Sequence, residues 1–396
     1  MIKNGEIKFI EFVQRNFCIL LVTFISIVAL FIRTYYLDCV SLDMSECYLE
    51  WFNFTKTNGG LLSLGKVIEG CDYTQTYLTI LAILSYIPNI KPLYLIKFVS
   101  FIFDFLVSIF AGKIVTLFID DKSNKKILFC ITYSIFLLLP SLIINSSNWG
   151  QCDSIYTAFV LISIYYLLQN KYLKSFIFYG IAFSFKLQSV LILPLYIIYY
   201  FKEKKFSILY FLIIPSVFII CCLPSIILGH SIFDCFGVYL FQITEYTSSM
   251  SLNIQNIYGI IPNFDGLPYI CFGIFMLIMI ILLINTCESK EQITQVQIID
   301  LSLISVSTAV FLLPCMHDRY LFMADILSVI WFIVRRKNIF VPLIINFISF
   351  NSYCISSYGE GLFISQNVLS IMYLIVVVFL INHYFNEIKS VNAKEE

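Results

Sequence analysis

Acidic residues gather in the polar stretch of residues 33–72, which follows the first long apolar segment of this chain. The carboxylates there are Asp38, Asp43, Glu46, Glu50, Glu69 and Asp72, against the cations Arg33, Lys56 and Lys66. The chain is 60% hydrophobic, so a polar stretch of this length is exceptional in it. Carboxylates gathered beside a membrane, on the side where few cations are expected, predict the floor of an active site.

Asp43 and Asp72 each have two competing interpretations. Asp43 is followed three residues later by Glu46, the spacing of a capping box in which the Asp43 side chain accepts a backbone N–H. Asp72 precedes a second apolar helix and fits an N-cap in the same way. A carboxylate can also take the proton of a reacting hydroxyl group as a general base. Spacing alone favours capping at both positions.

A second polar constellation lies between two apolar segments: Asn145-Ser-Ser-Asn148-Trp149-Gly-Gln151-Cys-Asp153-Ser154. Trp149 alone is typical of an interfacial anchor, and Asp153 alone of a helix cap. Together these types also fit a sugar-binding surface, where the indole packs on a pyranose face and amide and carboxylate oxygens accept hydroxyl hydrogens. Trp149, Gln151 and Asp153 are therefore candidates for substrate binding, with both interpretations open.

A third constellation, Met316-His317-Asp318-Arg319-Tyr320, follows Pro314 and precedes the next apolar segment. It fits a solvated turn. It also fits a phosphate clamp, because an arginine offers planar bidentate donors and a histidine offers one more. Positively charged residues are less common at the ends of spans outside the cytoplasm than inside it. Their presence here favours a function for His317 and Arg319.

Composition assigns these constellations to a membrane protein. A mean hydropathy of +0.89, with 13% charged and 17% aromatic residues, excludes a soluble domain. The 396 residues leave room for about 12 spans of roughly 20 residues each and for no separate soluble domain. We therefore predict an all-α, polytopic helical membrane protein with one transmembrane domain over residues 1–396. The net charge of +0 implies no attraction to nucleic acid.

Apolar segments are predicted to cross the membrane with both termini in the cytoplasm. They are residues 17–32, 93–118, 127–144, 155–168, 175–185, 189–201, 206–228, 267–286, 298–314, 321–334, 339–353 and 362–383. This assignment puts the basic clusters on the cytoplasmic side, as the positive-inside rule expects. The clusters are Lys122, Lys125 and Lys126; Lys171 and Lys174; Lys202, Lys204 and Lys205; Lys290; and Arg335, Arg336 and Lys337. The expected location is the bacterial cell membrane, or the endoplasmic reticulum membrane in a eukaryote.

Residues 33–92 form the first external loop of this topology, with two interfacial helices. In the first helix, apolar residues recur at i, i+3, i+4 and i+7: Met44, Cys47, Tyr48, Trp51, Phe52 and Thr55. The second helix, residues 77–87, is too short for a confident span.

Lys186 and Gln188 join two short spans, and such half-buried polar turns line cavities. Residues 229–266 form a second large external loop without clear periodicity, which fits a lid and a passive connector equally.

The 13 cysteines contain no Cys-x-x-Cys pair and no Cys/His cluster at zinc spacing, so we expect no metal site. Most lie in apolar runs and are expected to be small core residues. The exceptions lie in or near external loops, where a disulfide can form: Cys39, Cys47, Cys71, Cys152 and Cys235.

Motifs for nucleotide binding are absent from the sequence: there is no Gly-x-Gly-x-x-Gly and no Walker Gly-Lys-Ser/Thr. The zinc-binding motif His-Glu-x-x-His is absent as well. We therefore expect no cofactor. An enzyme that works on the external face without nucleotides needs an activated substrate carried by the membrane. A polyprenyl-phosphate sugar is the leading candidate for that substrate.

Five motifs occur in order between residues 33 and 322. They are Asp43 after the first span, Asp72-Tyr73 opening an apolar helix, the Asn-x-x-x-Trp-Gly-Gln-x-Asp-Ser run from Asn145, Phe185-Lys186-Leu-Gln188, and His317-Asp-Arg-Tyr-Leu-Phe322. The ordered set resembles the GT-C superfamily of membrane glycosyltransferases. The resemblance is closest to bacterial relatives of the mannosyltransferases that build glycosylphosphatidylinositol anchors, with kinship to the glucosyltransferases that extend lipid-linked oligosaccharides.

This resemblance implies inverting transfer from a lipid-phosphate sugar, with Asp43 as the general base and His317 and Arg319 on the donor phosphate. The substrate-binding residues that it implies are Asp72, Tyr73, Trp149, Gln151, Asp153, Lys186 and Gln188. The chain departs from the family in two places: Asp72-Tyr73-Thr74-Gln75 replaces Asp-Tyr-Pro-Pro, and Asp318 replaces a glutamate. The resemblance favours catalysis at Asp43 over capping alone.

We therefore predict a glycosyltransferase that moves mannose or another hexose from a polyprenyl-phosphate donor to a cell-envelope glycan or glycolipid. A transporter or flippase of lipid-linked glycans, and a polysaccharide polymerase, are the alternatives. A transporter predicts internal repeats, and the sequence shows none.

Overall fold

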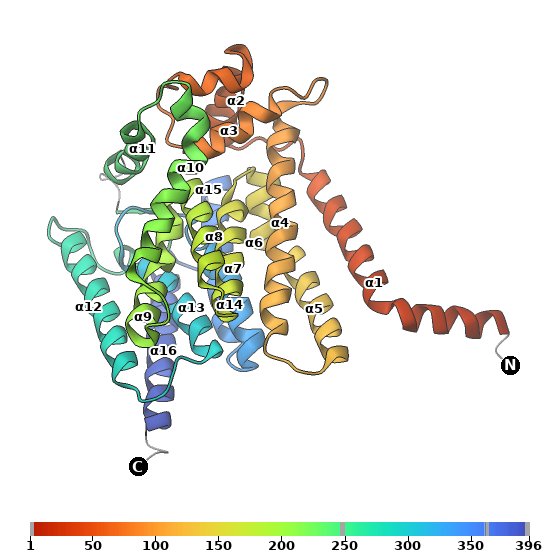
Figure 1. Ribbon diagram of the computed structural model, residues 1–396, viewed down its shortest axis with the longest axis vertical. Helices are drawn as coiled ribbons and strands as arrows, with labels where there is room; N and C mark the ends of the chain where they lie inside the picture. Colours follow the sequence, from red (N-terminus) through yellow and green to blue (C-terminus); the bar gives the residue numbers. More distant parts are fainter. Residues whose placement is uncertain (1–3, 246–249, 360, 362–363, 393–396) are drawn as a thin grey trace.

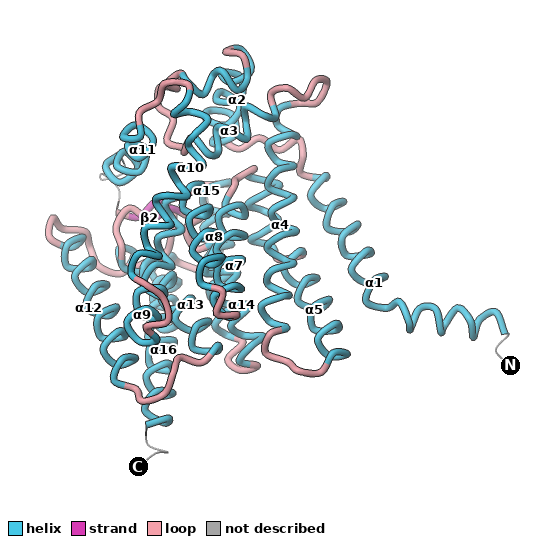
Figure 2. The backbone as a smooth tube through the Cα atoms, in the orientation of Figure 1, coloured by secondary structure: helices cyan, strands magenta, loops and turns pink. Residues whose placement is uncertain are grey.

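The computed structural model of the protein describes residues 4–245, 250–359, 361 and 364–392. Most of this part of the chain is helical (Figures 1 and 2). The strands found there, β1 (Ser251–Leu252) and β2 (Met316–His317), pair in parallel, with Ser251 opposite Met316. The prediction of an all-α protein is confirmed.

Most helices run side by side along the long axis of the molecule (Figure 1). In chain order they are α1 (Asn4–Tyr35), α2 (Leu49–Thr57), α3 (Gln75–Leu84), α4 (Pro92–Thr116), α5 (Lys122–Leu137), α6 (Pro140–Ile143), α7 (Asp153–Leu168), α8 (Tyr172–Phe185), α9 (Leu193–Glu203), α10 (Ile213–Ile227), α11 (Ile232–Glu245), α12 (Leu267–Glu288), α13 (Gln295–Leu312), α14 (Phe322–Arg335), α15 (Phe340–Tyr358) and α16 (Gln366–Asn392). Short 3-10 or π turns join some of them: η1 (Met44–Tyr48), η2 (Gly60–Gly65), η3 (Ile144–Trp149), η4 (Leu187–Ile192), η5 (Ile208–Leu212) and η6 (Ile257–Gly259).

Local sequence signals start several of these helices. Pro92 opens α4, where its missing N–H needs no partner. The Asp121 carboxylate accepts the backbone N–H of Asn124 at 2.8 Å and caps α5. Thr294 and Gln297 form a complete capping box at the start of α13. These helix starts follow from residues close together in the chain.

The predicted spans fall largely on helices where the structure describes them, but these helices differ in length. Residues 362–363, at the start of the last predicted span, lie outside the described residues. Seven described helices are long and apolar enough to cross a membrane: Gly5–Tyr35, Pro92–Thr116, Ile208–Ile227, Leu267–Glu288, Gln295–Leu312, Phe340–Ser357 and Gln366–Ser390. The helices Lys122–Leu137 and Pro140–Trp149 are bent by 51° relative to each other, and if they form one span, the number of candidate spans is eight. Helices α7, α8, α9 and α14 are shorter. The protein is therefore polytopic, and the predicted number of about 12 spans is not confirmed.

Burial separates inner helices from outer ones. Helix α13 buries every residue from Gln297 to Leu312, and an apolar helix that is covered on all sides belongs to the interior. Helix α12 instead exposes Ile270, Phe272 and Leu277, which is typical of a lipid-facing helix. The inner helices α7 and α14 follow directly on the segments that carry the polar motifs.

Helices α2 and α3 lie together at one end of the bundle (Figure 1). The predicted apolar face of the first interfacial helix is buried, including Tyr48, Trp51 and Phe52, which confirms its periodicity. Aromatic rings of the protein cover this face. The Trp51 ring centroid, for example, lies 5.0 Å from that of Tyr73. Helix α3 has 10 residues and is among the shorter helices, as a non-spanning segment requires.

The second large loop, residues 229–266, contains a helix that its sequence did not predict. Helix α11 lies at the same end as α2 and α3 (Figure 1). The Tyr239 hydroxyl donates to the Phe183 carbonyl, and the Gln242 amide donates to the Asp72 carbonyl. Residues 246–249 lie outside the described residues. The loop is thus attached to the bundle, which leaves both the lid and the connector open.

The cysteines of the chain are all free thiols. Several of those predicted near external loops, such as Cys152 and Cys235, are buried. The disulfide that those positions could form is therefore not present.

The basic clusters predict which end of the bundle faces the cytoplasm. These clusters lie in the connections after α4, α7, α9 and α14. In Figure 1 the connections are at the end of the bundle opposite to α2, α3 and α11. A reporter fused after Lys126 or Lys205 should therefore report the cytoplasm, and one inserted near Gly237 should report the outside. Labelling of a cysteine placed at Lys125 by an impermeant reagent from outside would contradict this orientation.

Candidate active site

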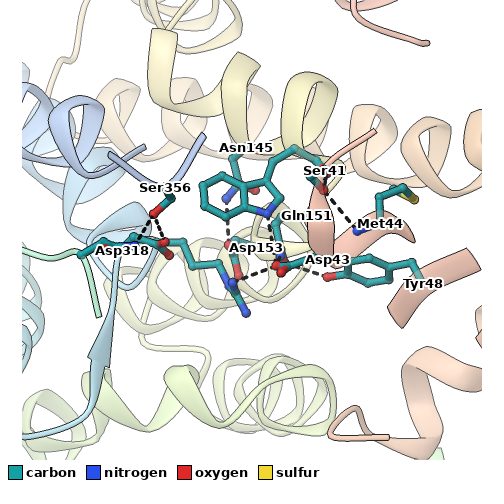
Figure 3. Close-up of polar contacts among 12 residues, drawn as sticks. Ser41, Asp43, Met44, Tyr48, Asn145, Gln151, Asp153, Asp318 and Ser356 are labelled. Atoms are coloured by element: carbon teal, nitrogen blue, oxygen red, sulfur yellow. Dashed lines mark hydrogen bonds and ion pairs between the residues drawn. The ribbon is translucent and has the colours of Figure 1, made fainter. Parts of the chain in front are cut away.

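The Asp43 carboxylate receives hydrogen bonds from two distant parts of the chain. Its Oδ2 atom accepts from Trp149 Nε1 at 3.1 Å, from Arg319 Nη1 at 3.1 Å and from the Gln151 amide, which lies beside Asp43 in Figure 3. The Asp43 side chain is 33% exposed and that of Arg319 is 15% exposed. The three motifs that the sequence singled out separately therefore meet at one oxygen atom.

The capping interpretation of Asp43 is wrong. Its backbone is helical, with φ −58° and ψ −36°, whereas an N-cap residue needs an extended backbone. The Asp43 side chain makes no capping bond, and Ser41 Oγ instead accepts the N–H of Met44 at 3.1 Å. Ser41 is a residue that the sequence analysis missed, although it immediately precedes the helical run that begins at Leu42, and a serine at that position is a recognised capping signal.

A buried pair of tyrosines orients Gln151. Its Oε1 atom accepts from the Tyr48 hydroxyl at 2.6 Å and from the Tyr73 hydroxyl at 3.2 Å. With Oε1 occupied by hydroxyl donors, the amide NH₂ of Gln151 is directed toward Asp43. Tyr73 and Gln151 were both predicted at the site. Tyr48 was missed, because its place in the apolar face of the first loop helix hid its polar role.

Asp153 and Lys186 form a buried ion pair next to this cluster. Lys186 Nζ lies 2.6 Å from Asp153 Oδ1, and Asn145 Nδ2 donates to Asp153 Oδ2 at 2.8 Å. Lys186 Nζ also lies 5.2 Å from the ring centroid of Tyr73. Asp153 makes no capping contact at the start of α7, so its interpretation as a helix cap is wrong. Both residues instead belong to the predicted site.

Asp72 borders the same cluster from the other side. Burial raises the pKa of its carboxyl group, and the nearby cations Arg319 and Lys186 act against that shift. Asp72 does not cap α3, because Thr74 occupies the capping position. The Asp72 carboxyl group is therefore available at the site, in an environment that favours the protonated form more than water does.

His317 and Asp318 precede Arg319 in the chain, and burial shifts the pKa of each. Burial, together with the charges of Arg319 and Lys186, lowers the pKa of His317 to about 3, so this imidazole is neutral near pH 7. The Asp318 carboxylate accepts the Ser356 hydroxyl, and burial raises the pKa of Asp318. His317 therefore contributes no charge, so Arg319 is the cation of this motif.

Gln188 lies at the start of η4, against the Tyr320 hydroxyl. Its Oε1 atom, like Arg319 Nε, is buried without a hydrogen-bond partner among the described residues. Buried polar atoms of this kind indicate a place where a ligand or a water molecule supplies the partner. All predicted site residues are thus on the borders of one region between α2, α7, η4 and β2.

A polar cavity adjoins this region, and an apolar cavity begins two residues after Gln188 along the chain. The polar cavity has a volume of about 530 Å³ and is lined by Cys39, Val40, Ser41, Leu42, Asp43, Ser45, Asn148, Trp149, Ser356 and Ser357. The apolar cavity, about 320 Å³, lies between η4, α9 and α12 and is lined almost wholly by aliphatic residues with Phe275. Among the described residues, no group of histidine, cysteine, aspartate or glutamate side chains is arranged to hold a metal ion.

Comparisons with known proteins find no protein-family model and no curated protein that match this chain.

Proposed function

We propose that the protein is a membrane glycosyltransferase of the GT-C type. It moves a hexose, mannose or a related sugar, from a polyprenyl-phosphate donor to a glycan or glycolipid acceptor on the external face. The observation that supports this most strongly is the Asp43 carboxylate, which three donors hold at Oδ2 while it borders a cavity of about 530 Å³. The Oδ1 atom is then free to accept the hydrogen of a substrate hydroxyl group.

The proposed reaction is a single displacement with inversion. Asp43 takes the proton of the acceptor hydroxyl as that oxygen forms a bond to the anomeric carbon. The bond between the anomeric carbon and the phosphate oxygen breaks, and its electron pair leaves on the polyprenyl phosphate. A positioned base of this kind contributes about 10²- to 10⁴-fold in rate. The Asp43 proton then passes to water.

Arg319 supports the departure of the phosphate. Its Nη1 atom is engaged by Asp43, but its buried Nε atom has no partner among the described residues and suits a phosphate oxygen. Lys186 and the neutral His317 lie close enough to contribute charge and a hydrogen bond, respectively. Hydrogen-bond donors that the fold already holds in place stabilise the negative charge that develops on the phosphate, because the protein does not have to reorganise during the reaction.

The apolar cavity suits the isoprenoid chain of the donor. Its lining begins at Val190, two residues after Gln188, and continues along α9 to Met279 of α12. Helix α12 is on the lipid-facing side of the bundle, so a chain in this cavity would connect the phosphate site with the bilayer. This arrangement supports lateral entry of the donor.

A direct transfer assay tests the proposal. Purified protein in proteoliposomes is incubated with a panel of radiolabelled polyprenyl-phosphate hexoses and acceptor glycans or glycolipids. We expect covalent transfer of label for at least one pair, and loss of that transfer in Asp43→Asn. Passage of intact labelled donor across the bilayer with no covalent product would instead show a flippase.

Arg319→Ala is expected to weaken binding of the polyprenyl-phosphate donor. A hydrogen bond to a charged group contributes about 1.5–3 kcal/mol, which corresponds to an increase of roughly 10- to 100-fold in the Kd of the donor. The measurement is equilibrium binding of a radiolabelled polyprenyl-phosphate hexose to purified protein.

Two variants control this experiment. Arg319→Lys keeps the charge but loses the planar fork, so its Kd should fall between those of the wild type and Arg319→Ala. Lys205→Ala removes a cation at the opposite end of the bundle and should leave the Kd unchanged. Donor binding by Arg319→Ala equal to that of the wild type would exclude Arg319 from the phosphate site.

A further inference from the structure

The polar cavity borders Asp43, and the proposed donor groups do not line it. Its lining comes from the start of the first loop, from η3 and from the end of α15, and includes Ser41, Asn148, Ser356 and Ser357. Lys186, Gln188, His317 and Arg319 do not line it. Apart from Asp43, the lining of the polar cavity therefore consists of neutral residues, several of which carry hydrogen-bonding groups.

The chemistry of the lining selects among ligands. Asp43 is the one charged residue among those that line the polar cavity, and its charge is already paired with Arg319. An anionic ligand would meet no cation there and would face the Asp43 carboxylate. Hydroxyl and amide groups instead match a neutral ligand that carries several hydroxyl groups. The volume of about 530 Å³ is within the range of small-molecule sites.

Asn148 and Trp149 supply the groups that a sugar needs. Within the described part of the chain, the Asn148 amide makes no hydrogen bond, so its donors and acceptor are available to a ligand. The Trp149 indole holds Asp43 through Nε1, which places the Trp149 ring beside the base. A sugar that packs on this ring would bring a hydroxyl group close to the Asp43 carboxylate.

A smaller cavity of about 180 Å³ continues the polar cavity. The two share Asn148 and Ser357, and the smaller one is also lined by Tyr36, Phe350, Tyr353 and Cys354. Tyr36 directly follows α1, and the other three residues belong to α15. The lining thus changes from hydroxyl-rich to aromatic with distance from Asp43, as a glycoside with an apolar aglycone requires.

We propose that the polar cavity is the acceptor site and that it binds an uncharged saccharide. This inference rests on the proposed function for the role of the bound sugar, but binding itself needs no donor and no turnover. The saccharide can come from a free glycan or from the headgroup of a glycolipid. A glycolipid would occupy the smaller cavity as well.

The test measures glycoside binding to the full chain in lipid nanodiscs by saturation-transfer difference NMR. The probes are methyl α-D-mannopyranoside, methyl α-D-glucopyranoside, their 6-phosphates and octyl α-D-glucopyranoside. We expect the neutral glycosides to bind and the phosphates to bind at least tenfold more weakly. Tighter binding of the octyl than of the methyl glucoside would identify a glycolipid headgroup as the source, and equal binding would identify a free glycan.

Ser357→Trp fills the cavity from an exposed position at the end of α15, and Asn148→Leu removes the free amide. Each should raise the Kd of the neutral glycosides at least tenfold while the Kd of the polyprenyl-phosphate donor is unchanged. Ser365→Trp, at an exposed serine that does not line the cavity, should change neither. Absent glycoside binding, preference for the phosphates, or full binding by both Ser357→Trp and Asn148→Leu would overturn the inference. Glycoside binding without any transfer from a polyprenyl-phosphate sugar would overturn the proposed function instead.

Discussion

Asp43→Asn is expected to lower the rate of sugar transfer by about 10²- to 10⁴-fold, because an amide cannot take the proton of the acceptor hydroxyl. The Asn side chain keeps the size of Asp and keeps an oxygen that can accept from Trp149 and Gln151. The Asp43 side chain caps no helix, so the change removes no capping bond. The variant should therefore fold and should bind the polyprenyl-phosphate donor. Single-turnover transfer measured beside donor binding separates the two steps.

Asp72→Asn is the matched control for this prediction. Asp72 borders the same cluster, but none of the described site residues donates a hydrogen bond to its carboxylate in the way that three donate to Asp43. We expect the loss of transfer rate in Asp72→Asn to be smaller than that in Asp43→Asn. Near-normal transfer by Asp43→Asn together with an inactive Asp72→Asn would make Asp72 the general base.

Asp104→Leu is expected to lower the free energy of unfolding by about 3–5 kcal/mol, because it leaves the buried charge of Arg33 without a partner. Arg33 Nε lies 2.8 Å from Asp104 Oδ2, and both side chains are fully buried between α1 and α4. Ser146 Oγ donates to the same Oδ2 atom at 2.6 Å, which links the pair to the turn that carries Trp149. The loss is measured as the equilibrium free energy of unfolding in mixed micelles.

The double variant Arg33→Met/Asp104→Leu should recover most of this loss, since removal of both charges leaves neither unpaired. Asp38→Asn is the matched control at an ion pair with Lys91, where the two side chains are 78% and 65% exposed. Because water screens that pair, its loss should cause no measurable change in stability. Equal stability of Asp104→Leu and the wild type would show that the Arg33–Asp104 pair does not stabilise the attachment of α1 to the bundle.

The sequence by itself determined the class of this protein and most of its helices. Apolar runs, prolines and capping residues act within a few positions of one another, so the starts of α4, α5 and α13 can be predicted from nearby residues. The periodicity from Met44 to Thr55 identified the face that is buried. The candidate site residues were also recognisable as polar types in unusual places, such as Lys186 between two apolar segments.

The tertiary structure decided how these residues combine. The partners of Asp43 lie 106, 108 and 276 positions away in the chain, so no local pattern could pair them. The roles of Tyr48 and Arg33 were hidden for the same reason, since each polar atom meets its partner only when separate helices pack. The neutral state of His317 likewise follows from burial beside two cations. Local propensity sets which segments are helices, but the packing of those helices sets which charges and hydrogen-bonding groups face one another.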